Sequence, residues 1–344
     1  MERQDAVSRY RSAAAILPSR LRSAALSIAE TRQARAEEIR LRVGQPMSIL
    51  LPEGELSTGA LVEPDDLETL CDIAAEFSRY AASETLKEGY LTVKGGYRVG
   101  LCGAAVMKDG NNTNLKYFSS AAVRIGRERK GISKDLAPRL FRNGRFESAL
   151  LLSPPGGGKT TLLRDLIRQL SSGADGYGPL RVALIDERGE IAASVRGQAQ
   201  MDVGPHTDIL DACPKALGVP ILLRAMNPQV IAMDELTTAE DLQAASMAAG
   251  CGVGLLATVH ASNVGELYEK PLYRELLSRR IFRFATRIER DADGERRYEV
   301  ESLYGDADAG PDAQTRENIA PDSGTRQEAD GGASESDAAP DTQS

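Results

Sequence analysis

The stretch SALLLSPPGGGKTTLLRDLIRQL at residues 148–170 is the strongest indication of fold class in this sequence. Residues 149–152 form a short apolar run that is typical of a buried parallel strand. A glycine-rich turn follows, and a helix then begins at Lys159. This order predicts a phosphate-binding loop, because glycines let backbone N–H groups turn toward an anion and the helix N-terminus favours negative charge.

The loop matches the motif G-x-x-x-x-G-K-[ST] except at its first position, where Ser153 replaces glycine. In this motif the lysine reaches the β- and γ-phosphates, and the next hydroxyl ligates Mg²⁺. We therefore expect ATP and Mg²⁺ as ligands. The expected nucleotide-binding residues are Ser153, Pro154, Pro155, Gly156, Gly157, Gly158, Lys159, Thr160 and Thr161.

The helix after the loop has apolar residues at helical spacing, which predicts one buried face. The expected buried residues are Leu162, Leu163, Leu166, Ile167 and Leu170. The same periodicity predicts an exposed face made of Arg164, Asp165, Arg168 and Gln169.

The region after residue 145 alternates strand and helix patterns, which is typical of an α/β fold with a parallel sheet. The expected strands are 149–153, 181–186, 229–234 and 254–259. The expected helices are 159–171, about 208–226 with an interruption at Pro214 or Pro220, and 239–249. A possible final hairpin turns at Asp293-Gly294.

We expect three parts: an α+β domain at 1–145, a P-loop domain at 146–304 and a tail at 305–344. Strand patterns at 37–51, 89–107 and 118–127 support the first part. The tail has ten acidic residues and two arginines, so it carries the whole net charge of −8. Because it has almost no large apolar residues, we expect it to be disordered.

Composition argues against several other classes of protein. The first 304 residues have no net charge, and the chain has no tryptophan, so direct binding of nucleic acid is not expected. The four cysteines lie far apart without a C-x-x-C pair, which predicts neither a disulfide framework nor a zinc site. No apolar run is long enough to span a membrane, and no secretory signal is recognisable.

Two of the expected strands end in the dipeptide Asp-Glu, at Asp186-Glu187 and at Asp234-Glu235. The carboxyl ends of parallel strands are where α/β sheets bind ligands. If one extra strand lies between the loop strand and strand 229–234, the core is RecA-like. Asp234 is then expected to hold Mg²⁺, and either Glu235 or Glu187 to orient the attacking water.

Polar residues also end the expected strand 254–259. Thr258 and His260 lie where a side chain can respond to the γ-phosphate, although a histidine here can also be purely structural. His206 lies in a loop of uncertain structure, and a structural role is the simpler interpretation for it.

Several motifs resemble the ATPases of type II and type IV secretion systems. The closest resemblance is to one branch of that superfamily, the stage III sporulation AA family of endospore-forming bacteria. It covers about residues 36–304. The motifs that carry it are EEIRLRVGQPMSI, GYLTVKGGYRVGLCG, SPPGGGKTTLLRD, DERGEIA, RAMNPQVIAMDE and LLATVHAS.

The resemblance implies a cytoplasmic mother-cell ATPase that forms a ring, expected to be a hexamer. Its implied partners are membrane proteins of a channel between mother cell and forespore. It also implies that one subunit lends arginines to the ATP of its neighbour. Candidates for this role are Arg98, Arg124, Arg127 and Arg129. The resemblance to the sporulation family also implies that serine is tolerated at the position of Ser153.

The expected chemistry is attack of water on the γ-phosphate of ATP. Lys159 and Mg²⁺ balance the charge, Glu235 or Glu187 orients the water, and His260 couples the phosphate state to strand movement. Two alternatives stay open: a P-loop ATPase directed by nucleic acid, and a nucleotide-dependent scaffold that does not hydrolyse ATP.

Overall fold

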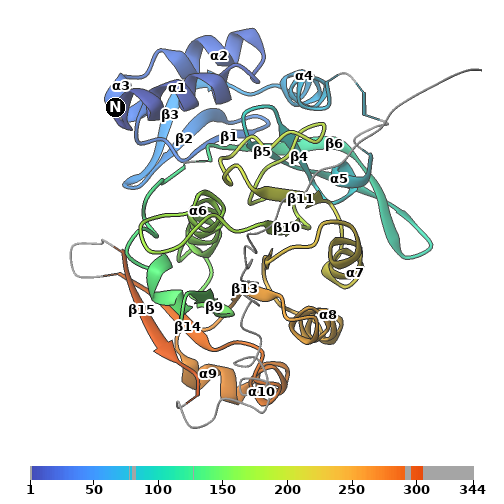
Figure 1. The fold of residues 1–344 in the computed structure, drawn as a ribbon. Helices are drawn as coiled ribbons and strands as arrows, with labels where there is room; N and C mark the ends of the chain where they lie inside the picture. The colour runs from blue at the N-terminus through green and yellow to red at the C-terminus, as the bar shows by residue number, and fades with distance from the viewer. Residues whose placement is uncertain (1, 77, 80–82, 127, 291–295, 305–344) are drawn as a thin grey trace, which may run out of the picture. The chain divides into compact units, whose positions relative to one another are not determined.

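The computed structural model describes residues 2–76, 78–79, 83–126, 128–290 and 296–304. Two large β-sheets organise them (Figure 1). In the described N-terminal part, six antiparallel strands form the first sheet in the order β3-β2-β1-β6-β5-β4. Their bounds are β1 (Glu38–Arg42), β2 (Pro46–Leu51), β3 (Gly54–Leu61), β4 (Tyr90–Val93), β5 (Tyr97–Lys108) and β6 (Asn111–Arg124).

Helices cover this first sheet and share one hydrophobic core with it. They are α1 (Glu2–Ala14), α2 (Ser19–Leu26), α3 (Glu30–Gln33), α4 (Pro64–Ala74) and α5 (Ser83–Lys87). Tyr10, Leu21 and Leu67 from the helices are fully buried against Ile39 and Val99 from the strands. The smaller α+β part expected at the N-terminus is therefore observed.

The second sheet has the order β11-β10-β12-β13-β9-β14-β15. Its strands are β9 (Ala149–Leu152), β10 (Val182–Asp186), β11 (Thr207–Asp211), β12 (Val230–Met233), β13 (Gly254–Val259), β14 (Phe284–Arg290) and β15 (Arg296–Ser302). All neighbouring pairs are parallel except β14 and β15. Because β13 lies between β9 and β12, the order is the one expected for a RecA-like core.

Helices cover both faces of this parallel sheet. On one side lies α6 (Lys159–Ser172), and on the other lie α7 (Lys215–Ala225) and α8 (Ala239–Gly250) (Figure 1). Two further helices, α9 (Val264–Glu269) and α10 (Pro271–Ser278), join the core of the α7 side. Along β9, Leu150 and Leu152 pack in that core, whereas Ala149 and Leu151 pack in the core of α6. Burial of both faces explains why these strands are continuous apolar runs.

One predicted element was wrong in part. The expected helix at 208–226 begins only at Lys215, and residues 207–211 form the edge strand β11. The backbone of the sequence TDILD pairs with β10 over its whole length. The helix starts after Pro214 and continues through Pro220, so only the first proline marks a boundary.

The two sheets belong to one compact unit that extends to Leu303. Along the chain, the segment between the two sheets contains a short helix η1 (Ala137–Leu140). It also contains the hairpin of β7 (Phe141–Arg142) and β8 (Arg145–Phe146). This hairpin crosses the expected domain boundary at residue 145, and the division into domains stays a prediction. Strands β14 and β15 form the expected final hairpin, but its turn at Asp293-Gly294 and the tail at 305–344 lie outside the described residues.

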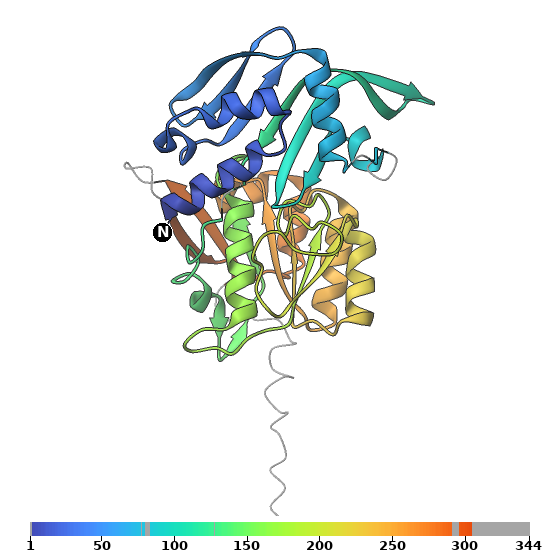
Figure 2. The ribbon, with the colours of Figure 1, turned by 90° about the horizontal axis from the view of Figure 1, so that it is seen from above.

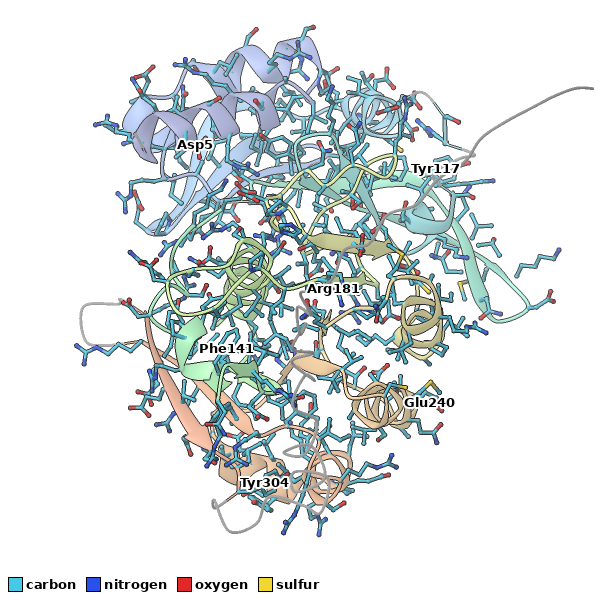
Figure 3. All side chains as sticks on the ribbon, viewed as in Figure 1. Asp5, Tyr117, Phe141, Arg181, Glu240 and Tyr304 are labelled. Atoms are coloured by element: carbon cyan, nitrogen blue, oxygen red, sulfur yellow. The ribbon has the colours of Figure 1, made fainter. Side chains whose placement is uncertain are left out.

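The hairpin of β5 and β6 extends beyond the rest of the first sheet (Figure 2). Tyr117 lies on it and points outward with 82% of its surface exposed (Figure 3). In the described part of the chain, no helix has the length and apolar character needed to cross a membrane.

Candidate functional site

The expected phosphate loop connects the buried strand β9 to helix α6. Gly156 and Gly158 have φ values of +73° and +104°, which favour glycine. Gly157 is also required by packing, because a Cβ built there would lie 1.6 Å from Ser153 Oγ. Ser153, the residue that departs from the motif, is therefore buried inside the loop and is compatible with its turn.

Lys159 is folded back onto this loop. Its Nζ donates hydrogen bonds to the carbonyl oxygens of Ser153, at 2.7 Å, and Pro154, at 3.2 Å. Burial lowers the pKa of Lys159, although the negative charges of Glu235 and Asp234 act in the opposite direction. To bind a phosphate, this ammonium group must exchange carbonyl partners for phosphate oxygens.

His260 links Lys159 to Glu235. Its Nδ1 lies 2.8 Å from Lys159 Nζ, and its Nε2 lies 2.9 Å from Glu235 Oε1. Because an ammonium group can only donate, Nδ1 is the acceptor, and the ring proton sits on Nε2 and is donated to Glu235. The three side chains thus form one continuous chain of contacts across the ends of neighbouring strands.

Asp234 follows the fully buried strand β12 directly and precedes Glu235. Its Oδ1 accepts a hydrogen bond of 3.1 Å from Thr258 Oγ1 on the neighbouring strand β13. Thr258 and His260 thus contact the two acids of this pair. No group of three or more metal-binding side chains occurs among the described residues.

The other acid pair has different surroundings. Asp186 is only 1% exposed, and its carboxylate accepts hydrogen bonds from the backbone N–H groups of Glu190, Ile191 and Ala192. Burial raises the pKa of Asp186, and these hydrogen bonds only partly oppose the effect. Glu187 forms an ion pair of 2.5 Å with Lys215 at the start of α7. Asp186 therefore organises the following loop, and Glu187 already has a cationic partner.

The expected exposed face of α6 was wrong for Arg164 and Asp165, which are 9% and 3% exposed. The guanidinium of Arg164 donates to the carbonyl oxygens of Glu190 and Ile191, so the loop held by Asp186 is also held from this helix. Their burial comes from contacts with distant segments, which helical periodicity does not report.

Asp165 ties the connector between the two sheets to α6. It accepts hydrogen bonds from the backbone of Gly131 and from the backbone and hydroxyl of Ser133, and it pairs with Arg168. Burial alone would raise the pKa of Asp165, but these hydrogen bonds outweigh it and lower the pKa. Helix α6, which begins at Lys159, is therefore hydrogen-bonded directly to the connector at Gly131 and Ser133.

The remaining candidates lie elsewhere. Arg98 forms an ion pair with Glu190 and lies over the ring of Tyr90, 3.9 Å from its centroid. Arg124 and Arg129 are exposed, whereas Arg127 lies outside the described residues. His206 contacts Ser171 through its backbone N–H and its ring Nδ1, in agreement with the structural interpretation.

Sequence reasoning missed Arg296 on β15. Its Nε donates a hydrogen bond of 3.2 Å to the carbonyl oxygen of Gly157 in the phosphate loop. The two residues are 139 positions apart. The only signal for Arg296 is its place in an alternating strand pattern, which does not reveal what the strand lies beside.

Comparison with solved structures supports the fold assignment. The pilus retraction motor PilT, solved with bound ADP, matches with a TM-score of 0.52 at 17% identity, over 79% of this chain and 80% of that one. The ATPase DotB of Yersinia pseudotuberculosis matches with a TM-score of 0.51 at 17% identity, over 79% and 76%. At these identities the likeness shows the fold alone, which is RecA-like.

Sequence comparison gives a closer relationship. The stage III sporulation protein AA of Bacillus subtilis (strain 168) is 34% identical over 269 residues, which covers 78% of this chain and 87% of that protein. The family model described as sporulation stage III, protein AA matches residues 7–306. The chain belongs to the stage III sporulation protein AA family.

Proposed function

We propose that this chain is a Mg²⁺-dependent ATP hydrolase of the secretion-ATPase type. The observation that carries the proposal is the chain of contacts from Lys159 through His260 to Glu235. It begins at the residue that directly follows the glycine-rich loop. A lysine at a helix N-terminus, linked through His260 to one of the two carboxylates that follow β12, suits binding of a triphosphate and positioning of a water.

Each residue of the site has a proposed role in binding. The loop at 153–158 and the backbone N–H groups at the start of α6 bind the phosphates, and Lys159 turns from its carbonyl partners toward them. Thr160 and Asp234 would hold Mg²⁺, since hydroxyl and carboxylate oxygens are ligands that this ion prefers. The ion supplies positive charge that balances the charge of the phosphates during the reaction.

Glu235 is the proposed residue that orients the water. Its carboxylate accepts a hydrogen bond from the water that attacks the γ-phosphate, and ADP and phosphate are the products. The His260 ring contacts Glu235 through one nitrogen and Lys159 through the other, so a movement of Lys159 toward the phosphates changes one of these two ring contacts. This exchange is a route by which the phosphate state reaches strand β13.

The family membership supports a role in sporulation. We infer that hydrolysis energises or assembles a channel between mother cell and forespore, with the chain in the mother-cell cytoplasm or at the inner membrane face. A ring of six copies and membrane-protein partners complete this proposal. Arg124 and Arg129 are the preferred donors to a neighbouring subunit, because Arg98 is engaged by Glu190 of its own chain.

The test measures ATP hydrolysis by the full chain against protein concentration, with molecular mass measured in parallel. We expect the rate per subunit to rise steeply as copies assemble, and Lys159→Ala to abolish hydrolysis. A monomer that hydrolyses ATP at a rate independent of concentration would contradict the ring. Nucleotide binding without turnover at any concentration would favour the scaffold alternative, and stimulation by duplex DNA would favour the nucleic-acid alternative.

A further inference from the structure

The hairpin of β14 and β15 touches the phosphate loop from outside the site described above. Arg296 at the start of β15 donates through Nε to the carbonyl oxygen of Gly157. Its guanidinium also packs against Gly158, since a Cβ built there would lie 2.9 Å from Cζ and Nε and 3.0 Å from Nη2. Gly158 therefore leaves the room that Arg296 fills.

The sheet register explains how a residue so late in the chain reaches this loop. Strand β14 pairs in parallel with β9, and Arg287 lies opposite Leu152, the last residue of β9. The hairpin continues three residues beyond Arg287, to the pair in which Arg290 lies opposite Arg296. This is about 10 Å along the strand, so the hairpin overhangs the loop that follows β9.

The contact with Gly157 fixes the orientation of one peptide group in the loop. The carbonyl of Gly157 and the N–H of Gly158 belong to the same planar trans peptide, so they point in opposite directions. A guanidinium that holds the carbonyl on its own side therefore directs the Gly158 N–H to the other side. Oriented N–H groups are what such a loop offers to an anion.

We propose that Arg296 is a positioning residue for nucleotide binding, which preorganises the phosphate loop through the carbonyl of Gly157. This inference rests on the proposed function, since it names a further determinant of the same nucleotide site. It makes the C-terminal hairpin part of that site, although none of the sequence motifs lies on it. The ligand class is a nucleoside diphosphate or triphosphate, whose phosphates the loop binds.

The test compares Arg296→Gln, Arg296→Lys and the control Arg297→Gln in the full chain. Arg297 is the next residue on the strand, carries the same charge and is exposed. The readouts are the dissociation constant for Mg²⁺-ADP, the KM and kcat for ATP, and the melting temperature without nucleotide. We expect Arg296→Gln to weaken ADP binding and raise KM about tenfold, because a hydrogen bond from a charged donor is lost.

A positioning role has a specific pattern in these readouts. Arg296→Lys keeps a donor and is expected to restore affinity to within about threefold of the wild type. Arg297→Gln is expected to bind as the wild type does, and the melting temperature without nucleotide is expected to stay unchanged in all three. Wild-type affinity in Arg296→Gln would overturn the inference alone. A wild type that binds no nucleotide would overturn the proposed function as well.

Discussion

The two Asp-Glu pairs of the second sheet are alike in sequence and in position but differ in what surrounds them. Asp186 accepts hydrogen bonds from three backbone N–H groups of the loop that follows it, whereas Asp234 accepts one from the hydroxyl of Thr258, among the residues that the structure describes. Glu187 is paired with Lys215, and Glu235 with His260, which in turn contacts Lys159. The first pair contacts the loop at 190–192 and the start of α7, and the second is linked through His260 to Lys159.

The comparison shows that strand-end position alone does not assign a catalytic role to a carboxylate. A carboxylate oxygen that already accepts hydrogen bonds from backbone N–H groups is less available to bind a metal ion or a water. Both carboxylate oxygens of Asp186 accept hydrogen bonds from the loop at 190–192. Arg164 on α6 donates hydrogen bonds to the same loop. We therefore assign a structural task to the first pair and propose a chemical task for the second.

The largest expected effect comes from replacing the two glutamates one at a time. Glu235→Gln is expected to lower kcat for ATP by about 10²–10⁴-fold, because the amide no longer orients the water as a carboxylate does. Binding of Mg²⁺-ADP is expected to stay within about threefold of the wild type. The measurement is steady-state hydrolysis at saturating ATP together with a direct binding titration.

Glu187→Gln is the matched control, since it makes the same change at the corresponding place of the other pair. Its kcat is expected to change by less than about threefold, because Glu187 is engaged by Lys215. An equal loss in both variants would break the distinction between the pairs. A loss confined to Glu187→Gln would reverse it.

The second effect is a change in the free energy of unfolding when Asp186 or Asp234 is replaced. Asp186→Asn is expected to lower the free energy of unfolding by about 2–3 kcal/mol, because an amide has only one acceptor oxygen for the N–H groups that Asp186 now binds. Asp234→Asn is expected to cost less than about 1 kcal/mol, since the amide oxygen of asparagine can keep the hydrogen bond that Asp234 accepts from Thr258 Oγ1. Urea unfolding without nucleotide measures both.

If Asp234→Asn were as destabilising as Asp186→Asn, the two carboxylates would share a structural task. Equal stabilities of wild type and Asp186→Asn would show that the loop at 190–192 does not depend on Asp186. A second prediction for Asp234→Asn is a higher Mg²⁺ concentration for half-maximal hydrolysis, which a purely structural role would leave unchanged.

The third effect is the pH dependence of stability, which is expected to differ between two buried aspartates, Asp186 and Asp165. Burial raises the pKa of Asp186 above 3.8, so the part of its contribution to stability that depends on its titration is full below that value and is lost as pH rises through the folded pKa. Hydrogen bonds lower the pKa of Asp165 below 3.8, so its contribution is present above that value and is lost as pH falls through the folded pKa.

The measurement is the free energy of unfolding of wild type, Asp186→Asn and Asp165→Asn from pH 7 down to about pH 3. The advantage of the wild type over Asp165→Asn is expected to shrink on acidification, and its advantage over Asp186→Asn to grow. Parallel curves for the two variants would show that the surroundings of these carboxylates do not set their titration.

The sequence predicted those parts of the fold and site that lie close together along the chain. The loop at 153–158 and its helix were predictable because strand, glycines and Lys159 follow one another directly. The presence of one strand between β9 and β12 agrees with the RecA-like arrangement that was considered for the acid after strand 229–234, but the sequence did not say which strand it is. Strand β11 was missed because its five residues lie next to a helix and prolines, and only pairing with β10 makes them a strand.

Contacts between distant segments were not predictable in the same way. Arg164 and Asp165 have the spacing of an exposed helical face, and their burial depends on residues 190–191 and 131–133. Arg296 depends on how far the hairpin of β14 and β15 extends past the end of β9. In each case a polar residue pairs with a backbone group of another segment, for which a local pattern gives no signal.

The smallest expected effect tests the ion pair of Glu187 and Lys215. The side chain of Lys215 is 7% exposed and that of Glu187 is 36% exposed, so water screens the pair from one side only. Lys215→Met keeps much of the apolar stem and is expected to change the free energy of unfolding by less than about 1 kcal/mol, with kcat unchanged. Urea unfolding and steady-state hydrolysis measure the two effects. A large loss of kcat with unchanged stability would mean that Lys215 holds Glu187 for the reaction, and the first acid pair would then share the chemistry proposed for the second.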